Sequence, residues 1–234
     1  IILKEKLANN SPVFCFFQII FYFFSCLNII NDVYLEYNTT NIFKKERLTL
    51  KKVGILTFHC SDNYGAMLQA YALKTYLRRN NYQADLIRYE PISLLGKHWL
   101  FPYTKQKTPI HTAYWSFKGF VKNLKKGNNF FEQRKNMQAF REKYIYDSDK
   151  KVSKSQLEDL DYNTFIVGSD QIWSPSITHG LDSAYFGAFT AYTHKNVISY
   201  AASMGGKSLP AKYDKDMKEM LKNLSHISVR EKEA

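Results

Sequence analysis

Residues 165–175 read FIVGSDQIWSP, and this stretch indicates the fold class of the whole chain. A short apolar run from Phe165 to Val167 ends at Gly168 and passes directly into polar residues, which is typical of a buried parallel strand followed by a loop. In open parallel sheets, ligands bind beyond the carboxyl ends of the strands, where such loops converge. The alternative interpretation is a plain Gly-Ser-Asp turn with Trp173 folded back onto the core.

Other segments complete an alternation of strands and helices. Residues 53–58 (VGILTF) predict a buried strand, residues 66–79 a helix with a core-facing apolar stripe, and residues 84–89 another strand. This unit has the length of a right-handed parallel crossover. Further patterns predict helices at 130–146 and 213–224, strands at 197–201 and 226–229, and a capping box at Ser155–Glu158. We therefore expect an α/β fold, namely a Rossmann-like parallel sheet with flanking helices.

Four of the predicted strands end in polar or glycine-rich tips. These tips are HCSDNYG (59–65), GSDQIW (168–173), AASMGG (201–206) and SVRE (228–231). In a parallel sheet they lie along one edge, where a glycine-containing turn can hold an anionic or sugar oxygen on its backbone N–H groups. The first tip matches neither GxGxxG nor GxxxxGK[ST], which excludes a dinucleotide site or a P-loop on that motif.

The tips offer several candidate chemical groups. Arg230 is a planar, two-pronged donor suited to a carboxylate or phosphate, although a surface salt bridge is the alternative. Asp170 is the best acid–base candidate, although such a carboxylate also commonly caps a helix. Nucleophilic catalysis is less supported, because Cys60 has no second histidine to activate it and Ser169 lacks the GxSxG pattern. The six histidines show no metal-binding spacing, so we expect no metal site.

The chain has 234 residues and a formal net charge of +12, and most of this charge is local. Residues 97–154 contain 14 Lys and Arg but only 4 Asp and Glu. Aromatic residues lie among them, so a nucleic-acid surface is one interpretation, but no known nucleic-acid-binding signature accompanies them. We favour solvated lysines around a basic insertion at 93–129, which shows no clear helical period, with attraction of an anionic substrate as a further alternative. We expect no nucleic-acid partner.

Residues 1–50 form a hydrophobic segment and a polar connector ahead of the domain expected at 52–234. Residues 7–31 carry no charged side chain. Three interpretations stay open: a segment extraneous to the domain, a membrane anchor, or a docked helix. The three cysteines form no CxxC pair and no disulfide framework, which fits a reducing compartment. We expect a cytoplasmic location, with the inner face of the membrane as an open alternative.

Taken in order, four segments resemble the polysaccharide pyruvyl transferase family. They are VGILTFHCSDNYGAMLQAYAL from residue 53, FIVGSDQIWSP from 165, VISYAASMG from 197 and ISVREKEA from 227. The family is similar to the two-domain GT-B glycosyltransferases, in which two Rossmann-like halves face a cleft. Its members transfer the enolpyruvyl group of phosphoenolpyruvate to a sugar hydroxyl pair, which leaves a pyruvate ketal and free phosphate. The chain starts with Ile and ends like the opening of a helix, so we expect an N-terminal half that is inactive alone.

The resemblance also assigns residues. It implies that the cleft is lined by Asn63, Tyr64 and Gly65, and that its central loop consists of Gly168, Ser169, Asp170, Gln171 and Trp173. Arg230 resembles the family arginine that meets the anionic donor. We name Asp170 and Arg230 as catalytic candidates and add Ser203 to the substrate-binding ones.

The resemblance also defines the expected ligands. No cofactor is implied beyond phosphoenolpyruvate as donor, and the other partner is a saccharide acceptor. The family's general-acid histidine lies in the other half, so neither His59 nor His226 takes that role. The competing hypothesis is a catalytically silent Rossmann-like module that binds a saccharide or a partner protein, with membrane tethering left open.

Overall fold

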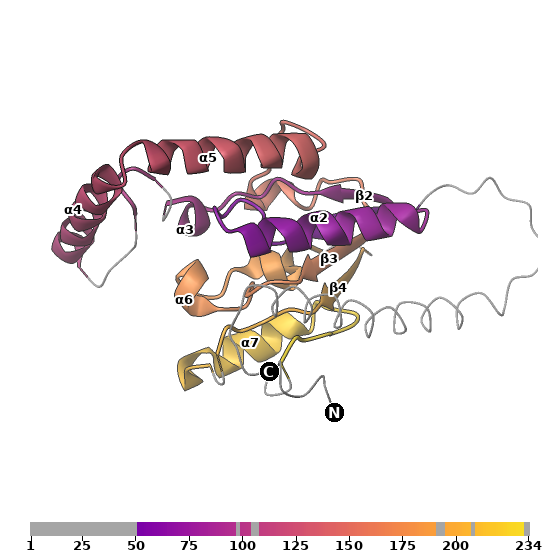
Figure 1. Cartoon of the computed structure of the whole chain (residues 1–234). Helices are drawn as coiled ribbons and strands as arrows, with labels where there is room; N and C mark the ends of the chain where they lie inside the picture. Colours follow the sequence, from indigo (N-terminus) through magenta and orange to yellow (C-terminus); the bar gives the residue numbers. More distant parts are fainter. Residues whose placement is uncertain (1–50, 97–98, 104–107, 191–194, 207–208, 232–234) are drawn as a thin grey trace, which may run out of the picture. The chain divides into compact units, whose positions relative to one another are not determined.

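The computed structural model describes residues 51–96, 99–103, 108–190, 195–206 and 209–231. Their centre is a sheet of four parallel strands in the order β2-β1-β3-β4 (Figure 1). The strands are β1 (Lys52–Leu56), β2 (Gln83–Leu86), β3 (Thr164–Gly168) and β4 (Asn196–Tyr200). This sheet confirms the predicted α/β class and its Rossmann-like parallel arrangement.

The sheet is covered on both faces, as continuous apolar strands require. Because successive side chains of a strand point to opposite faces, Phe165 and Val167 of β3 join one apolar cluster and Ile166 joins another. Helix α2 (Tyr64–Arg79) lies over the cluster of Ile166 with its predicted apolar stripe. The cluster of Phe165 includes side chains from the chain after β3.

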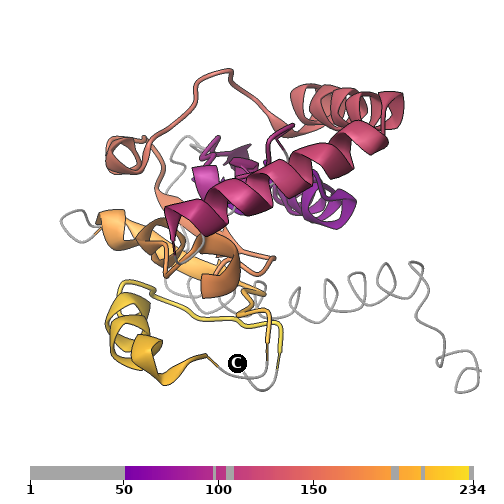
Figure 2. The same cartoon turned by 90° about the vertical axis from the view of Figure 1, so that its left-hand side faces the viewer.

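The segment between β2 and β3 is helical. It contains α3 (Ile92–Leu95), α4 (Pro109–Lys125), α5 (Asn128–Phe140) and a π-helical turn (Arg141–Ile145). The predicted helix at 130–146 is therefore confirmed, but the expectation of an aperiodic stretch at 93–129 was wrong, because α4 occupies much of it. Figure 1 shows α4 beyond the end of α5, away from the strands, and in Figure 2, which is viewed from that side, α4 crosses in front of the domain.

The chain after β3 contains short helices and ends beside β4. Its α-helices are α6 (Pro175–Thr178) and α7 (Asp214–Leu221). The strand predicted at 226–229 is reduced to two parallel bridges, Ile198 to His226 and Ala202 to Val229, which still place this segment alongside β4.

The predicted capping box lies two residues earlier than expected. The backbone N–H of Ser153 donates to Oε1 of Gln156 (2.9 Å), whereas Ser155 lies inside the 3-10 turn that follows. The box at Ser155–Glu158 was therefore wrong in register.

The hydrophobic segment of residues 1–50 lies outside the described residues, so its three interpretations stay predictions. Among the helices that the structure does describe, none is both long enough and apolar enough to cross a bilayer.

Candidate active site

Three of the four predicted tips meet at the carboxyl edge of the sheet. The N–H of Ser169 donates to the carbonyl of Tyr200 at the end of β4 (2.6 Å). The N–H of Ser203 donates to the carbonyl of Asp170 (3.0 Å), and the N–H of Trp173 donates to the carbonyl of Ser203 (3.1 Å). These backbone bonds hold the GSDQIW and AASMGG tips against each other, as the parallel sheet predicted.

Gly168 makes this close approach possible. Its φ of +134° is a conformation that residues with a side chain rarely adopt. A Cβ atom at this position would lie 2.3 Å from the carbonyl oxygen of Tyr200. Gly168 therefore acts through its backbone, by letting the β3 tip turn across the end of β4.

Arg230 reaches the same place from the end of the described chain. Its N–H donates to the carbonyl of Ala202 (3.0 Å), and its Nη2 donates to the buried hydroxyl of Ser203 (2.9 Å). Glu231 accepts from the guanidinium at Nε (3.2 Å) and Nη2 (3.1 Å), and from Ser203. The Arg230 side chain is 37% exposed, so the guanidinium is held in place but open to solvent. Of the Glu231 carboxylate, Oε2 is buried and has no hydrogen-bond partner among the described residues.

Asp170 lies in the same cluster. Its carboxylate accepts the N–H of Gln171 (2.7 Å). Burial raises the pKa of this carboxyl group, and the opposing effects of the Gln171 hydrogen bond and the Arg230 charge do not cancel the rise. A carboxyl group with a raised pKa exchanges its proton closer to neutral pH, as an acid–base residue requires.

Trp173 is part of the core instead of the surface of the site. Its ring is 2% exposed and stacks on Phe186 at a centroid distance of 5.4 Å, and its Nε1 donates to the carbonyl of Tyr185 (2.9 Å). This is the packing that the alternative interpretation of the loop described. Gln171 is half-buried, and its amide oxygen lies against Gly205 of the AASMGG tip.

The remaining tip, HCSDNYG (59–65), leads into α2 and does not join the cluster of Asp170, Ser203 and Arg230. Asn63 is the N-cap residue of α2 and accepts the N–H of Ala66 (3.2 Å), while Tyr64 and Gly65 follow it as exposed residues of the first turn. Asp62 forms a buried ion pair (2.8 Å) with Arg141, the residue that follows α5. This tip thus contributes to a neighbouring part of the sheet edge.

A comparison with models of protein families shows to which family this chain belongs. A model of the polysaccharide pyruvyl transferase family matches residues 63–233. The chain belongs to this family. Comparisons with curated proteins and with solved structures returned no match. The family match confirms the resemblance carried by the strand tips, and it covers the whole Asp170–Ser203–Arg230 cluster.

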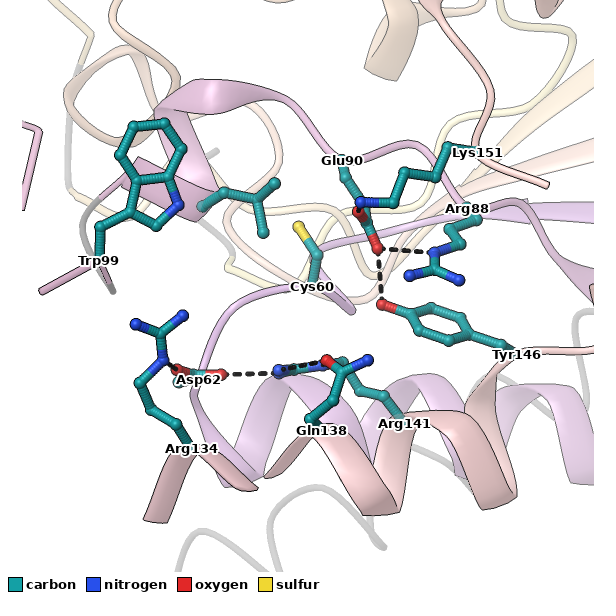
Figure 3. A pocket seen from close by; sticks show the side chains of 11 residues that line it. Cys60, Asp62, Arg88, Glu90, Trp99, Arg134, Gln138, Arg141, Tyr146 and Lys151 are labelled. Atoms are coloured by element: carbon teal, nitrogen blue, oxygen red, sulfur yellow. Dashed lines mark hydrogen bonds and ion pairs between the residues drawn. The ribbon is translucent and has the colours of Figure 1, made fainter. Parts of the chain in front are cut away.

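In this family member, a pocket of about 240 Å³ opens at the carboxyl ends of β1 and β2 (Figure 3). Six of its lining residues carry formal charges: Asp62, Arg88, Glu90, Arg134, Arg141 and Lys151. No single motif signals them, because they come from the ends of β1 and β2, from α5 and from the loop before β3. The available signal was the basic excess at 97–154, which contains three of the four cations.

Cys60 and His59 of the first tip are both buried side chains. Burial raises the pKa of the Cys60 thiol to about 12 and lowers the pKa of His59 to about 4, so both side chains are neutral at pH 7. His59 is fully buried, with Nδ1 3.0 Å from the carbonyl of Thr57. No group of three or more potential metal ligands occurs among the residues described.

Proposed function

We propose that this chain is the N-terminal half of an enzyme that transfers a pyruvyl group from phosphoenolpyruvate to a hydroxyl pair of a cell-surface polysaccharide or its precursor. One observation carries the proposal: Asp170, Ser203 and Arg230 converge at the carboxyl edge of the sheet, within the region that matches the family. In this proposal a second Rossmann-like half faces the edge, as in the GT-B arrangement, and the enzyme works in the cytoplasm.

The reaction balances without an oxidant, a reductant or a cofactor. Both acceptor hydroxyl oxygens bond to C2 of phosphoenolpyruvate, and the bond between C2 and the phosphate oxygen breaks. One hydroxyl proton ends on C3, which becomes the methyl carbon of the ketal, and the other leaves with phosphate. The protein therefore has to neutralise an anionic donor and move protons.

Arg230 suits the donor because a guanidinium binds carboxylate and phosphate with two parallel hydrogen bonds. Ser203 and Glu231 hold it from one side, and its exposed fraction leaves the other side open to a ligand. Asp170 suits proton transfer because its pKa is raised by burial. We assign Asp170 the task of accepting a proton from the attacking hydroxyl.

The proposal is tested in the full-length enzyme with the Arg230→Ala variant. We expect the Kd for phosphoenolpyruvate, measured by titration calorimetry, to rise at least tenfold, because the cation that meets the donor is lost. Phosphate release with a panel of hexosides should fall by about 10²–10³ in kcat/KM, the usual effect of removing a positioned charge donor.

Lys222→Ala serves as the control variant. Lys222 lies eight residues before Arg230 and forms an exposed ion pair with Glu219 (2.7 Å), so its loss removes one cation that is not a member of the Asp170–Ser203–Arg230 cluster. Unchanged phosphoenolpyruvate affinity in Arg230→Ala would overturn the assignment of the donor site. Absence of phosphate release in the unaltered enzyme with every hexoside, together with no phosphoenolpyruvate binding, would favour the silent binding module instead.

A further inference from the structure

The pocket at the ends of β1 and β2 carries an excess of positive charge. Four lining cations face the two carboxylates of Asp62 and Glu90. Burial alone would raise the pKa of Glu90, but hydrogen bonds from Lys151, Tyr146 and Arg88 together lower it to about 2. Glu90 is therefore ionised at neutral pH and contributes one full negative charge to the lining. Two positive charges in the lining stay unmatched, which favours an anionic ligand.

The four cations divide into two whose side chains are mostly buried and two whose side chains are exposed to solvent. Arg141 donates to Asp62 (2.8 Å), and Arg88 donates to Glu90 (2.9 Å) while its guanidinium lies 4.1 Å from the ring centre of Tyr146. These two side chains form the rigid wall of the pocket.

Arg134 and Lys151 are the exposed cations, although each also forms an ion pair, with Asp62 and Glu90 respectively. The nearest carboxylate oxygen to Arg134 belongs to Asp62 and lies 3.7 Å from Nε, which is too long for a hydrogen bond, and the side chain is 39% exposed. Lys151 is 63% exposed and contacts Glu90 with one of its three N–H donors. Figure 3 shows the two side chains on opposite sides of Cys60.

The remaining lining suits a sugar ring. Trp99 exposes 43% of its surface and can stack on the apolar face of a ring. The Gln138 amide of the lining is already bonded to Glu142 and Arg141. A volume of about 240 Å³ lies below the range of pockets for drug-sized ligands, so a single sugar residue fits better than a nucleotide.

We propose that this pocket is the acceptor subsite and that it takes a sugar residue bearing a carboxylate or a phosphate. The inference rests on the proposed function for the role of the sugar as acceptor. Arg134 and Lys151 bind the oxyanion, and Trp99 supports the ring, so the pocket selects acidic over neutral saccharides.

Titration calorimetry with four probes tests this selectivity without turnover: glucuronate, glucose 1-phosphate, glucose and phosphoenolpyruvate. We expect glucuronate or glucose 1-phosphate to bind at least tenfold more tightly than glucose, and their comparison tells which oxyanion is preferred. Arg134→Ala should weaken the acidic sugar at least tenfold and leave phosphoenolpyruvate binding unchanged. Lys151→Ala should act in the same direction if Arg134→Ala does not fold.

Lys135→Ala is the matched control, because Lys135 is the next residue of α5, is exposed and does not line the pocket. Equal affinity for glucose and both acidic sugars would overturn the inference. The inference would also be overturned if Arg134→Ala lost as much affinity for phosphoenolpyruvate as for the acidic sugar. In that case the pocket would hold the donor. If Arg230→Ala left phosphoenolpyruvate binding unchanged, the donor-site assignment would be wrong, but the sugar titrations with Arg134→Ala would still test the acceptor subsite. The two proposals can therefore fail separately.

A second, independent observation concerns the outer face of α4. Five large apolar side chains follow one another at intervals of four and three residues, which places them on a single stripe: Ile110, Tyr114, Phe117, Val121 and Leu124. All five are exposed, with Ile110 at 80% and Phe117 at 62%. An apolar stripe of this length facing solvent indicates a surface that something covers.

The other side of α4 is the one that packs against the protein. Phe120 stacks on Phe101 at a centroid distance of 3.9 Å, and the amide of Asn123 donates to the carbonyls of Trp99 and Leu100 (3.2 and 3.3 Å). A Cβ atom on Gly119 would lie 2.2 Å from Pro102, so the helix is in close contact there. The orientation that exposes the stripe is therefore held by specific contacts.

Charge indicates what covers the stripe. Lys118, Lys122 and Lys125 lie beside it on the helix, and no acidic residue occurs between Glu90 and Glu132. Trp115 adds an exposed aromatic ring of the kind enriched at membrane interfaces. A cationic helix with an apolar stripe and aromatic residues suits the surface of an anionic bilayer.

We infer that α4 lies on the surface of an anionic membrane with its apolar stripe in the headgroup region. Flotation with vesicles of phosphatidylglycerol and phosphatidylcholine should recover the protein, and vesicles of pure phosphatidylcholine should recover at least fivefold less. The double variant Ile110→Glu/Phe117→Glu should lower recovery at least tenfold, whereas Ile227→Glu, at an exposed apolar residue outside α4, should not.

Recovery that the double variant leaves unchanged would overturn the inference, because another segment would then bind the lipid. A dimer in solution that the double variant converts to a monomer would also overturn it, since a second copy would be the occupant of the stripe. Thermal unfolding by circular dichroism checks that the variants are folded, and Lys118→Gln/Lys122→Gln provides a milder pair that should reduce recovery and its salt dependence.

Discussion

At the scale of single residues, the GSDQIW loop combines two opposite environments. Trp173 turns into the core and stacks on Phe186, whereas Asp170 stays at the sheet edge beside Arg230. Both side chains belong to the motif that carried the family resemblance. A motif residue can therefore shape the site through packing, without contacting a substrate.

Burial of Asp170 leads to a stability prediction. Because its folded-state pKa is raised, the folded chain keeps this proton at pH values where the unfolded chain has lost it, so stability falls as pH rises through that window. Asp170→Asn removes the titration, and we expect it to be more stable than the parent at pH 7, because no charge is then buried at this position. The difference should shrink toward zero below about pH 4, as measured by urea unfolding between pH 4 and pH 8.

The same variant separates the two interpretations of Asp170. If the carboxylate mainly caps the turn through the N–H of Gln171, Asp170→Asn is less stable than the parent at every pH, and the prediction is wrong. If it moves a proton, kcat in the full-length enzyme falls by about 10²–10⁴ while the Kd for phosphoenolpyruvate changes little. Asp159→Asn, at an exposed carboxylate, controls for the loss of one charge.

At the scale of elements, the end of β3 needs a glycine at position 168 for two reasons, its positive φ and the lack of space for a Cβ atom. A comparison with Gly180 separates the two. Gly168 has φ of +134° and no space for a Cβ atom, whereas Gly180 has φ of +130° with no atom near the position of its Cβ. We expect Gly180→Ala to cost about 1–2 kcal/mol through backbone strain alone. Gly168→Ala should cost at least 2 kcal/mol more, because the β3 tip must move away from Tyr200.

Urea unfolding of the two glycine variants measures this difference, and far-UV circular dichroism shows whether Gly168→Ala folds at all. Equal losses in the two variants would show that the contact with Tyr200 relaxes easily. In that case the close packing of the GSDQIW and AASMGG tips would not depend on the absence of a side chain at Gly168.

Helix α4 shows how an element can be missed from sequence. The residues of its stripe repeat at intervals of four and three, but charged and small residues interrupt them and no predicted core partner existed for the stripe. Such interruptions make the period of the 93–129 segment hard to detect from sequence. A helix whose apolar stripe faces outward gives the same periodic signal as a core helix, and the signal is meaningful even without a core partner.

At the scale of the whole domain, the two apolar clusters share the strands of one sheet. Phe165 and Ile166 are adjacent on β3 but belong to opposite clusters. We expect Phe165→Ala to cost about 3–5 kcal/mol and Ile166→Ala about 2–5 kcal/mol, each lowering a single unfolding transition. Far-UV circular dichroism and tryptophan fluorescence should report the same midpoint for each variant.

Ile227→Ala, at an exposed position, is the control and should change stability by less than about 0.5 kcal/mol. Two separate transitions in either core variant would show that the faces of the sheet unfold independently. The prediction of a single cooperative core would then be wrong.

The sequence by itself determined the fold class, the strand order along the chain and the family. Buried strands are nearly continuous apolar runs and end in polar tips, so local composition was enough to find β1, β3 and β4 and to expect their tips on one edge. The Asp170, Ser203 and Arg230 positions followed from those tips. Their mutual contacts follow from the parallel register, which places the ends of neighbouring strands side by side.

Only the tertiary structure decided which of these side chains stay accessible and which partners they meet. Trp173 went into the core, Asn63 was used as a helix cap, and the charged pocket was assembled from segments up to 91 residues apart, between Cys60 and Lys151. The direction of a side chain and the pairing of distant charges depend on packing between elements, which no local pattern encodes. For that reason the tips could be found from sequence, whereas the pocket and the outward face of α4 could not.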